Sequence, residues 1–220
     1  MEYQKILNHI DHTALEATVT LADIRRLCEE ASRYGCASVC IPPSYVAEAD
    51  AWRKAAGTAL SICTVIGFPL GYQTTALKVI EATQAVNDGA DEIDMVINLG
   101  MVKNGDWTSL TNELTAIRVA TSGRILKVII ETCYLTESEK IRLCGLVTEI
   151  KADYIKTSTG FGSAGATLAD IELFKKHIGP AVKIKAAGGI RTREDMIAYL
   201  EAGCDRIGSS RGVALLTRPD

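Results

Sequence analysis

Two lysines and one aspartate lie where the strands of a buried sheet are expected. Asp94, Lys156 and Lys185 each interrupt a short run of β-branched residues. Because strand side chains alternate between two faces, the flanking isoleucines can face one side of the sheet while these three residues face the other. One such lysine alone would be expected to extend to solvent. Burying a charge is costly unless it is paired, so three charged residues on one face predict a functional site.

The three side chains together indicate covalent catalysis by an amine. An amine attacks a carbonyl only when it is unprotonated, whereas a free lysine, with a pKa of about 10.4, is almost wholly charged at neutral pH. A second cation close by, together with partial removal from water, lowers that pKa. Lys156 and Lys185 on neighbouring strands would supply such a pair, and Asp94 would hold the second ammonium group and relay protons. The three residues therefore predict an enzyme that forms an imine with a carbonyl compound.

Strands and helices alternate along the whole chain, and no linker divides it. Alternation of this kind builds a parallel sheet covered by helices, and eight repeats in 220 residues fit a closed (β/α)8 TIM barrel. We therefore predict an α/β protein with a single domain, residues 1–220. An open doubly wound sheet is the alternative, although no Gly-x-Gly-x-x-Gly follows the first strand. The predicted strands are His9–His12, the weakest, and Ser38–Ile41, Ser61–Ile66, Glu92–Ile97, Ile125–Ile130, Tyr154–Thr157, Val182–Ala186 and Arg206–Gly208.

Short polar motifs mark the ends of the predicted helices. Capping boxes, in which a threonine hydroxyl and a carboxylate three residues later satisfy free backbone donors, are expected at four starts. Glycines that suit a left-handed cap conformation are expected at three ends. The starts are at Thr20, Thr136, Thr167 and Thr192, and the ends are at Gly35, Gly89 and Gly203.

Gly-rich and Ser-rich segments follow the last three predicted strands. Barrel enzymes carry their chemistry at the C-terminal ends of the strands, and they often bind phosphate with the loops after strands seven and eight. Small residues expose backbone N–H groups there, and serine hydroxyls add further donors. Two ordinary Gly-rich turns are the alternative. The predicted substrate- and phosphate-binding residues are Gly160, Gly188, Gly189, Ser209, Ser210 and Arg211.

Composition excludes several other classes of protein. The formal net charge of −3 argues against a nucleic-acid partner, which requires a basic surface. No apolar run is long enough to span a bilayer, and the first residues lack the pattern of a signal peptide. The seven scattered cysteines predict reduced thiols and a cytoplasmic location. His9, Asp11 and His12 could bind a metal, but a catalytic zinc usually requires three protein ligands, and we predict none.

Six segments, in order along nearly the whole chain, resemble one enzyme family. They are Asp11–Leu15, Thr64–Gly71, Glu92–Asn98, Glu131–Thr136, Asp153–Phe161 and Lys183–Arg191. In these segments the chain resembles the 2-deoxyribose-5-phosphate aldolase family, most specifically around Lys156 and Lys185. The resemblance implies a class I aldolase, a carbon–carbon lyase that reversibly cleaves 2-deoxy-D-ribose 5-phosphate to acetaldehyde and D-glyceraldehyde 3-phosphate. It implies that Lys156 forms the imine, that Lys185 is the activating lysine, and that Asp94 assists proton transfer.

The resemblance also bears on the phosphate loops and on one cysteine. Gly188, Gly189 and Ser210 match positions around the phosphate, and Cys40 matches a family cysteine near the active site, with an inert buried thiol as the alternative. Family members commonly have a second serine where this chain has Arg211. An arginine there could strengthen phosphate binding or point to solvent. Many members also end in a tyrosine that can assist proton transfer, whereas this chain ends Thr-Arg-Pro-Asp.

Small molecules are the expected partners, namely a sugar phosphate and aldehydes, and the sequence leaves a homo-oligomer, either a dimer or a tetramer, open. No cofactor is expected, because the imine serves as the electron sink. The alternatives are a Schiff-base barrel aldolase for another sugar phosphate, a non-catalytic barrel that binds a sugar phosphate, and an isomerase barrel that uses a carboxylate base.

Overall fold

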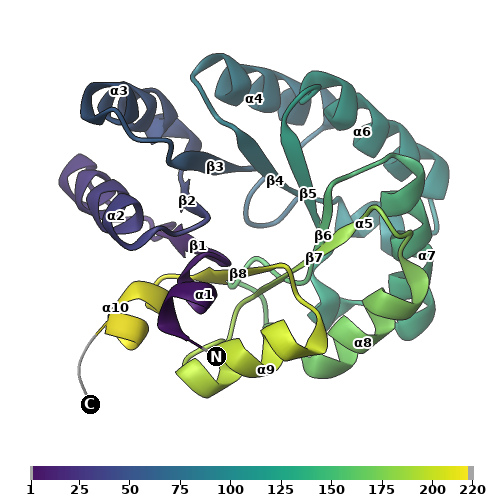
Figure 1. Cartoon of the computed structure of the whole chain (residues 1–220). Helices are drawn as coiled ribbons and strands as arrows, with labels where there is room; N and C mark the ends of the chain where they lie inside the picture. Colours follow the sequence, from purple (N-terminus) through teal and green to yellow (C-terminus); the bar gives the residue numbers. More distant parts are fainter. Residues whose placement is uncertain (1, 218–220) are drawn as a thin grey trace.

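The chain folds into a closed barrel of eight parallel strands. The computed structural model describes residues 2–217. Each strand pairs with the next and β8 pairs with β1, which closes the barrel inside a ring of helices (Figure 1). All eight predicted strands are present with ends within one residue of the prediction, so the TIM-barrel prediction is confirmed. The strands are β1 (Ile10–Thr13), β2 (Ser38–Ile41), β3 (Ser61–Ile66), β4 (Glu92–Val96), β5 (Ile125–Ile129), β6 (Tyr154–Lys156), β7 (Lys183–Ala187) and β8 (Arg206–Ser209).

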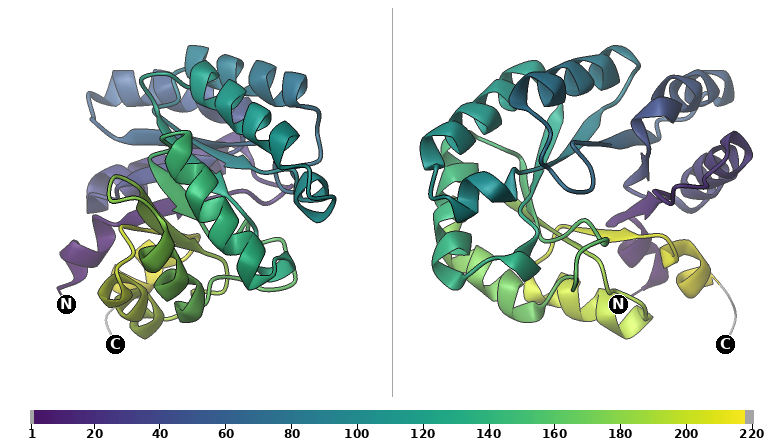
Figure 2. Two further views of the ribbon diagram at one scale, coloured as in Figure 1. Left: turned by 90° about the vertical axis from the view of Figure 1, so that its right-hand side faces the viewer. Right: turned by 180° about the vertical axis from the view of Figure 1, so that it is seen from behind.

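Helices cover the outside of the barrel in chain order, and the first and last of them lie side by side, as both views in Figure 2 show. Among residues 2–217, no helix combines the length and the apolar character needed to cross a bilayer. The α-helices are α1 (Tyr3–Leu7), α2 (Leu21–Tyr34), α3 (Val46–Ala56), α4 (Thr75–Asn87), α5 (Leu99–Lys103), α6 (Trp107–Ala120), α7 (Glu137–Glu149), α8 (Leu168–His177), α9 (Arg193–Ala202) and α10 (Gly212–Thr217), and two short 3-10 helices are η1 (Pro43–Tyr45) and η2 (Thr132–Tyr134).

Three of the four predicted capping boxes form, at Thr20, Thr136 and Thr192. At the fourth, Thr167 accepts the N–H of Asp170, but the reciprocal bond to the Thr167 backbone does not form. The Asp170 carboxylate instead pairs with Lys140 at 2.6 Å and accepts the Thr167 hydroxyl. A stronger, charged partner has therefore replaced the backbone donor. The glycines predicted at helix ends, Gly35, Gly89 and Gly203, all have left-handed φ angles.

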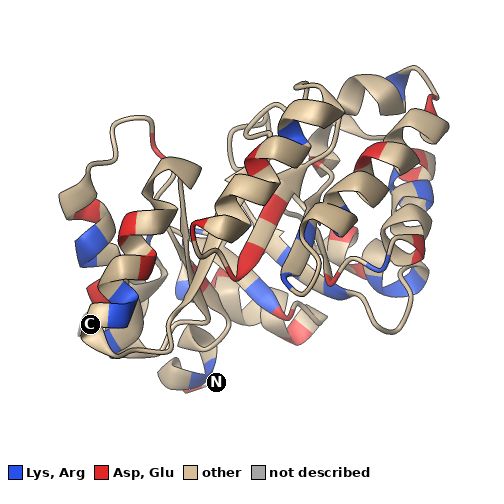
Figure 3. Ribbon diagram, turned by 90° about the horizontal axis from the view of Figure 1, so that it is seen from above, with Lys and Arg blue, Asp and Glu red and all other residues tan. Residues whose placement is uncertain are grey.

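The apolar core lies between the barrel and its helices. Ile93, Met95 and Val128 belong to this core, and each is fully buried. The residues that alternate with them along the strands face the barrel axis, and several of these are charged. Figure 3 shows Lys, Arg, Asp and Glu on the barrel strands as well as on the outer helices. A charged barrel interior requires close pairing, and the strand register provides it.

Candidate active site

Asp94 is the centre of the charged network inside the barrel. One of its oxygens, Oδ2, accepts hydrogen bonds from Lys156 Nζ at 2.7 Å and from Lys185 Nζ at 2.6 Å. Lys156 and Lys185 are register partners on β6 and β7, which brings the two amines to one oxygen. All three side chains are nearly or fully buried. The structure thus brings together the three residues predicted from strand alternation.

A third lysine completes the coordination of Asp94. Lys127 on β5 is the register partner of Asp94, and its Nζ lies 2.8 Å from Asp94 Oδ1 and 2.5 Å from Glu92. Asp11 on β1 pairs with both Lys185 and Arg206, and Arg206 also lies 2.9 Å from Glu92. Sequence reasoning did not select Lys127, Glu92 or Arg206. Lys127 could have been found, because it stands within the apolar run Ile125–Ile130 on the inward-facing positions.

The connected cluster contains one more cation than it has carboxylates. The formal charges of these salt-bridged groups sum to +1, and the buried carboxylate of Glu131 lies within electrostatic range of Lys156. Lys156 is the member of the cluster that lines a cavity. The cations are Lys127, Lys156, Lys185 and Arg206, and the carboxylates are Asp11, Glu92 and Asp94.

Pairing within the cluster fixes the charge of its other members. Burial alone would raise the pKa of Asp94, but Lys127, Lys156 and Lys185 hold it well below its usual range. Burial alone would lower the pKa of Lys185, but Asp11 and Asp94 raise it above its usual value. Lys185 therefore remains an ammonium ion at neutral pH. A charged Lys185 is what the expected activating role requires.

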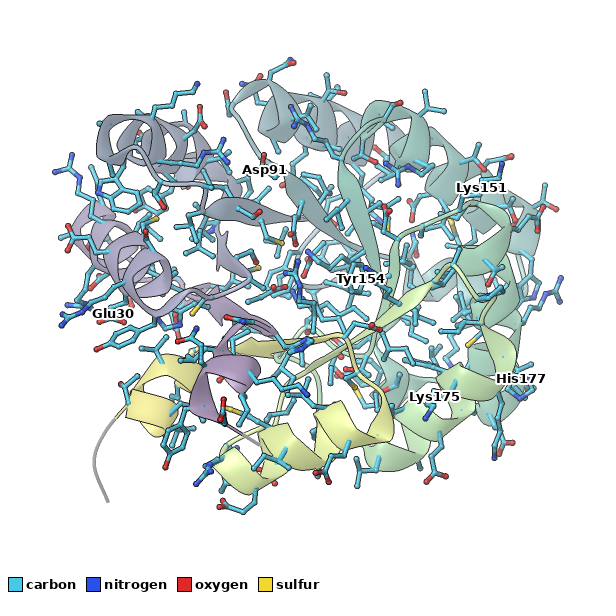
Figure 4. The ribbon with its side chains drawn as sticks, viewed as in Figure 1. Glu30, Asp91, Lys151, Tyr154, Lys175 and His177 are labelled. Atoms are coloured by element: carbon cyan, nitrogen blue, oxygen red, sulfur yellow. The ribbon has the colours of Figure 1, made fainter. Side chains whose placement is uncertain are left out.

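Tyr154 lies near the centre of the barrel in Figure 4. Its ring is within cation–π distance of Lys127 at 5.9 Å and of Arg206 at 5.8 Å. These contacts cover the inner side of both cations with an aromatic surface. By contrast, Lys175 and His177 belong to the outer helix α8 in the same view.

A cavity of about 460 Å³ opens at the C-terminal ends of the strands, above Lys156. All six predicted binding residues line it: Gly160, Gly188, Gly189, Ser209, Ser210 and Arg211. Thr13 and Arg191 also contribute to its wall. Gly188 and Gly189 have φ angles of 79° and 77°, which a residue with a side chain rarely adopts. The loops therefore present backbone and small side chains to the cavity.

Some donors of the loop after β7 are already occupied. Asp195 accepts the backbone N–H groups of Arg191 and Thr192, each at 3.0 Å. The N-terminus of α9 is therefore capped by its own carboxylate. The N–H groups of Arg191 and Thr192 are therefore not available to an anion in the cavity.

Glu131 is a further residue that sequence reasoning did not assign to the site. It follows β5 with a φ of 53° and is one of two non-glycine residues with left-handed φ between residues 2 and 217. Its buried carboxylate accepts the N–H of Thr159 at 3.2 Å as well as the Thr159 hydroxyl. Burial raises the pKa of Glu131. The carboxylate thus holds the loop from Thr159 to Phe161, which lines the cavity.

The possible metal ligands near the N-terminus do not converge. Asp11 faces the barrel interior, whereas His12 Nε2 lies 3.0 Å from Glu30 on α2. His9 Nδ1 interacts with the carbonyl oxygen of Asp205. Strand alternation separates these side chains, because neighbouring residues of β1 point to opposite faces. Cys40 lies inside the barrel near the lysines, but it does not line the cavity.

The fold and the site define a (β/α)8-barrel enzyme with a lysine-rich active site. The profile of the DeoC/LacD family aldolases matches residues 5–217. The chain belongs to this family of aldolases, which are carbon–carbon lyases.

Individual relatives agree with this assignment. The chain is 55% identical over 216 residues to the deoxyribose-phosphate aldolase of Clostridium botulinum (strain Eklund 17B / Type B), covering 98% of this chain and 96% of the relative. It is 50% identical over 224 residues to that of Streptococcus pyogenes serotype M5, covering 100% and 99%. The tetrameric deoxyribose phosphate aldolase of Aeropyrum pernix superposes with a TM-score of 0.89 at 30% identity, covering 98% and 91%.

Proposed function

We propose that this protein cleaves 2-deoxy-D-ribose 5-phosphate reversibly to acetaldehyde and D-glyceraldehyde 3-phosphate, with Lys156 as the imine-forming residue. The observation that carries the proposal is the position of Lys156, which shares one carboxylate oxygen with Lys185 at the floor of a cavity. The names of the relatives at 50% identity or more support the same reaction.

In the proposed mechanism, the unprotonated amine of Lys156 attacks the C1 aldehyde, loss of water gives an imine, and the imine nitrogen takes up a proton relayed by Asp94. The C3 hydroxyl loses its proton, the C2–C3 bond breaks, and its electron pair moves into the imine to form an enamine. Glyceraldehyde 3-phosphate leaves, and C2 of the enamine is protonated. Water then hydrolyses the imine, which releases acetaldehyde and restores the amine. Asp94 relays the protons that these steps release and take up. Lys185 stays positively charged beside it.

Borohydride trapping tests this proposal directly. Wild-type protein incubated with 2-deoxy-D-ribose 5-phosphate and sodium borohydride should carry a reduced adduct on the peptide that contains Lys156, located by mass spectrometry. A parallel assay should detect acetaldehyde. Turnover without any adduct on Lys156 would show that another group forms the covalent bond, and a panel of sugar phosphates identifies the preferred compound.

Arg211 is expected to contribute to phosphate recognition. It lines the same cavity as Ser209 and Ser210, and a charge-assisted hydrogen bond contributes about 1.5–3 kcal/mol. Arg211→Ala should therefore raise KM for the phosphorylated sugar roughly tenfold or more. It should leave turnover of unphosphorylated 2-deoxy-D-ribose unchanged, and steady-state kinetics with both sugars measures the difference. Equal losses with the two sugars would assign Arg211 to the barrel's stability instead.

Glu131→Gly is expected to weaken substrate binding without lowering stability. Glycine relieves backbone strain of about 1–3 kcal/mol, which offsets the lost hydrogen bonds to Thr159 of about 1 kcal/mol each. The freed loop should raise KM about tenfold, a change of about 1.4 kcal/mol. Thermal denaturation and steady-state kinetics measure the two effects.

Lys151→Gly is the matched control for that variant. Lys151 is the other non-glycine residue with left-handed φ among those described, at 54°, and it is exposed at the far end of the barrel from the cavity. It should gain stability with no change in KM. If Glu131→Gly also left KM unchanged, the loop would not depend on Glu131.

We propose a cytoplasmic setting. All seven cysteines are free thiols, which supports a compartment that keeps thiols reduced. We also propose a homo-oligomer, because the Aeropyrum pernix relative is described as tetrameric. Light scattering coupled to size-exclusion chromatography would measure the assembly, and a mass equal to that of one chain would contradict it.

A further inference from the structure

Two cysteines face each other inside the barrel, beside the charged cluster. Cys40 on β2 and Cys63 on β3 are register partners, and both are fully buried. Neighbouring strands lie roughly 4.8 Å apart, a separation within the Cα–Cα range of about 4.4–6.8 Å found for disulfides. The two sulfur atoms lie within 4.8 Å of each other. The proposed reaction uses neither thiol.

The pair is connected directly to the residue that holds the two lysines. Cys63 Sγ donates to Asp94 Oδ1 at 3.1 Å and accepts from Lys127 Nζ at 3.3 Å. Leu15 packs against the thiol pair, and it also lines the cavity. One layer of side chains therefore separates the thiols from the cavity that admits small molecules.

The surroundings favour oxidation of the pair over metal binding. The two thiols and Asp94 could in principle hold a metal ion, because their ligand atoms lie within 4.8 Å of one another. However, the carboxylate already binds Lys127, Lys156 and Lys185, and these basic groups disfavour another cation at the same place. A neutral disulfide adds no charge to the cluster.

We propose that Cys40 and Cys63 form a reversible disulfide when the protein meets hydrogen peroxide, and that this disulfide inactivates the enzyme. The Cys40 thiolate attacks one peroxide oxygen and breaks the O–O bond, which gives a sulfenic acid and hydroxide. The Cys63 sulfur then attacks the sulfenic sulfur and expels the second oxygen as water. Two thiols and one peroxide thus give one disulfide and two water molecules, and two electrons pass from sulfur to oxygen.

The surroundings of the two thiols indicate which cysteine reacts with the peroxide first and which then forms the disulfide. Contact with the Cys63 thiol lowers the pKa of Cys40, and the Lys185 ammonium acts in the same direction against the effect of burial. Burial raises the pKa of Cys63 well above its usual value, and Cys40 and Asp94 add to this effect. Cys40 is therefore the first nucleophile, and Cys63 resolves the sulfenic acid.

Loss of activity follows from the contacts of Cys63. A sulfur bonded to Cys40 has no proton to donate to Asp94, and it moves away from Lys127. The carboxylate that positions Lys156 and Lys185 then loses one of its fixed neighbours.

Peptide mapping after hydrogen peroxide treatment tests this inference without relying on aldolase activity. The treated wild type, alkylated in denaturant and digested, should yield a peptide pair that joins Cys40 to Cys63. Its activity should fall and should return with dithiothreitol. Cys144→Ala removes another buried thiol, on α7, and should behave as the wild type in both measurements.

Cys40→Ala and Cys63→Ala should each lack the joined peptides and the loss that dithiothreitol reverses, when each variant is compared with its own untreated activity. Two independent variants keep the test valid if one of them does not fold. Inactivated wild type without the joined peptides would overturn the proposal, and so would an equal, reversible loss in both variants.

Discussion

Lys156→Met is expected to abolish aldol cleavage while the protein stays folded. The variant lacks the amine that forms the imine, and removal of a covalent nucleophile lowers kcat by a factor on the order of 10⁴ to 10⁶. Methionine keeps the length and apolar stem of the side chain. Asp94 keeps its ion pairs with Lys127 and Lys185 in this variant. The melting temperature should therefore stay close to that of the wild type.

Lys183→Met provides the control for Lys156→Met. Lys183 begins β7 and is exposed, so the loss of its amine should change neither activity nor borohydride trapping. Acetaldehyde release, the trapped adduct and thermal denaturation are measured for both variants. Substantial residual cleavage by folded Lys156→Met, above the rate in buffer, would remove Lys156 from its proposed role.

Asp94→Asn is expected to lower both stability and activity strongly. The substitution leaves Lys127, Lys185 and Arg206 with two carboxylates, and breaking a buried ion pair costs about 3–5 kcal/mol. For a chain of this length the melting temperature should fall by about 10 °C or more. The amide can neither hold both amines nor exchange a proton with them, so kcat should fall by about 10² to 10⁴.

The pH dependence of stability gives a second measure of Asp94. Burial raises the pKa of Asp94, but Lys127, Lys156 and Lys185 outweigh burial and hold that pKa well below its usual range. A carboxylate whose pKa is lowered in the folded state contributes its full stabilisation at pH values above its unfolded pKa of about 3.9. That contribution is lost as the pH falls through the lower, folded-state value. The difference in unfolding free energy between wild type and Asp94→Asn should therefore be flat above about pH 4 and shrink below it.

Lys185 should show the opposite pH dependence, at high pH. Burial lowers its pKa, but Asp11 and Asp94 raise it above its usual value. Its contribution to the unfolding free energy is therefore complete below the unfolded pKa of about 10.4 and is lost as the pH rises through the higher, folded-state pKa.

Lys103→Met is the control for Asp94→Asn, because it breaks an ion pair with Glu139 in which the lysine is 45% exposed. Such a pair contributes about 1 kcal/mol or less. A similar loss of unfolding free energy in Lys103→Met and Asp94→Asn would show that the buried cluster stabilises the protein no more than an exposed ion pair does.

Local sequence patterns were sufficient to predict the architecture and the three residues at the centre of the candidate site. Eight β-branched runs and the threonine and glycine signals between them specify alternating strands and helices, because these preferences act over a few residues. Strand alternation placed Asp94, Lys156 and Lys185 on one face, and the loops after β6, β7 and β8 followed from barrel geometry. These inferences need only local periodicity and the order of elements along the chain.

The pairing of the charged side chains depends on the three-dimensional fold. Lys127 bonds to Asp94, Arg206 bonds to Asp11 and Glu92, and Glu131 reaches Thr159. These partners are 28 or more residues apart in sequence, and their contacts depend on barrel closure, strand stagger and a left-handed backbone at Glu131. Which buried charges offset one another likewise depends on the closed barrel. Local sequence patterns specify which face a residue occupies, whereas the packing of eight strands around one axis specifies its partners.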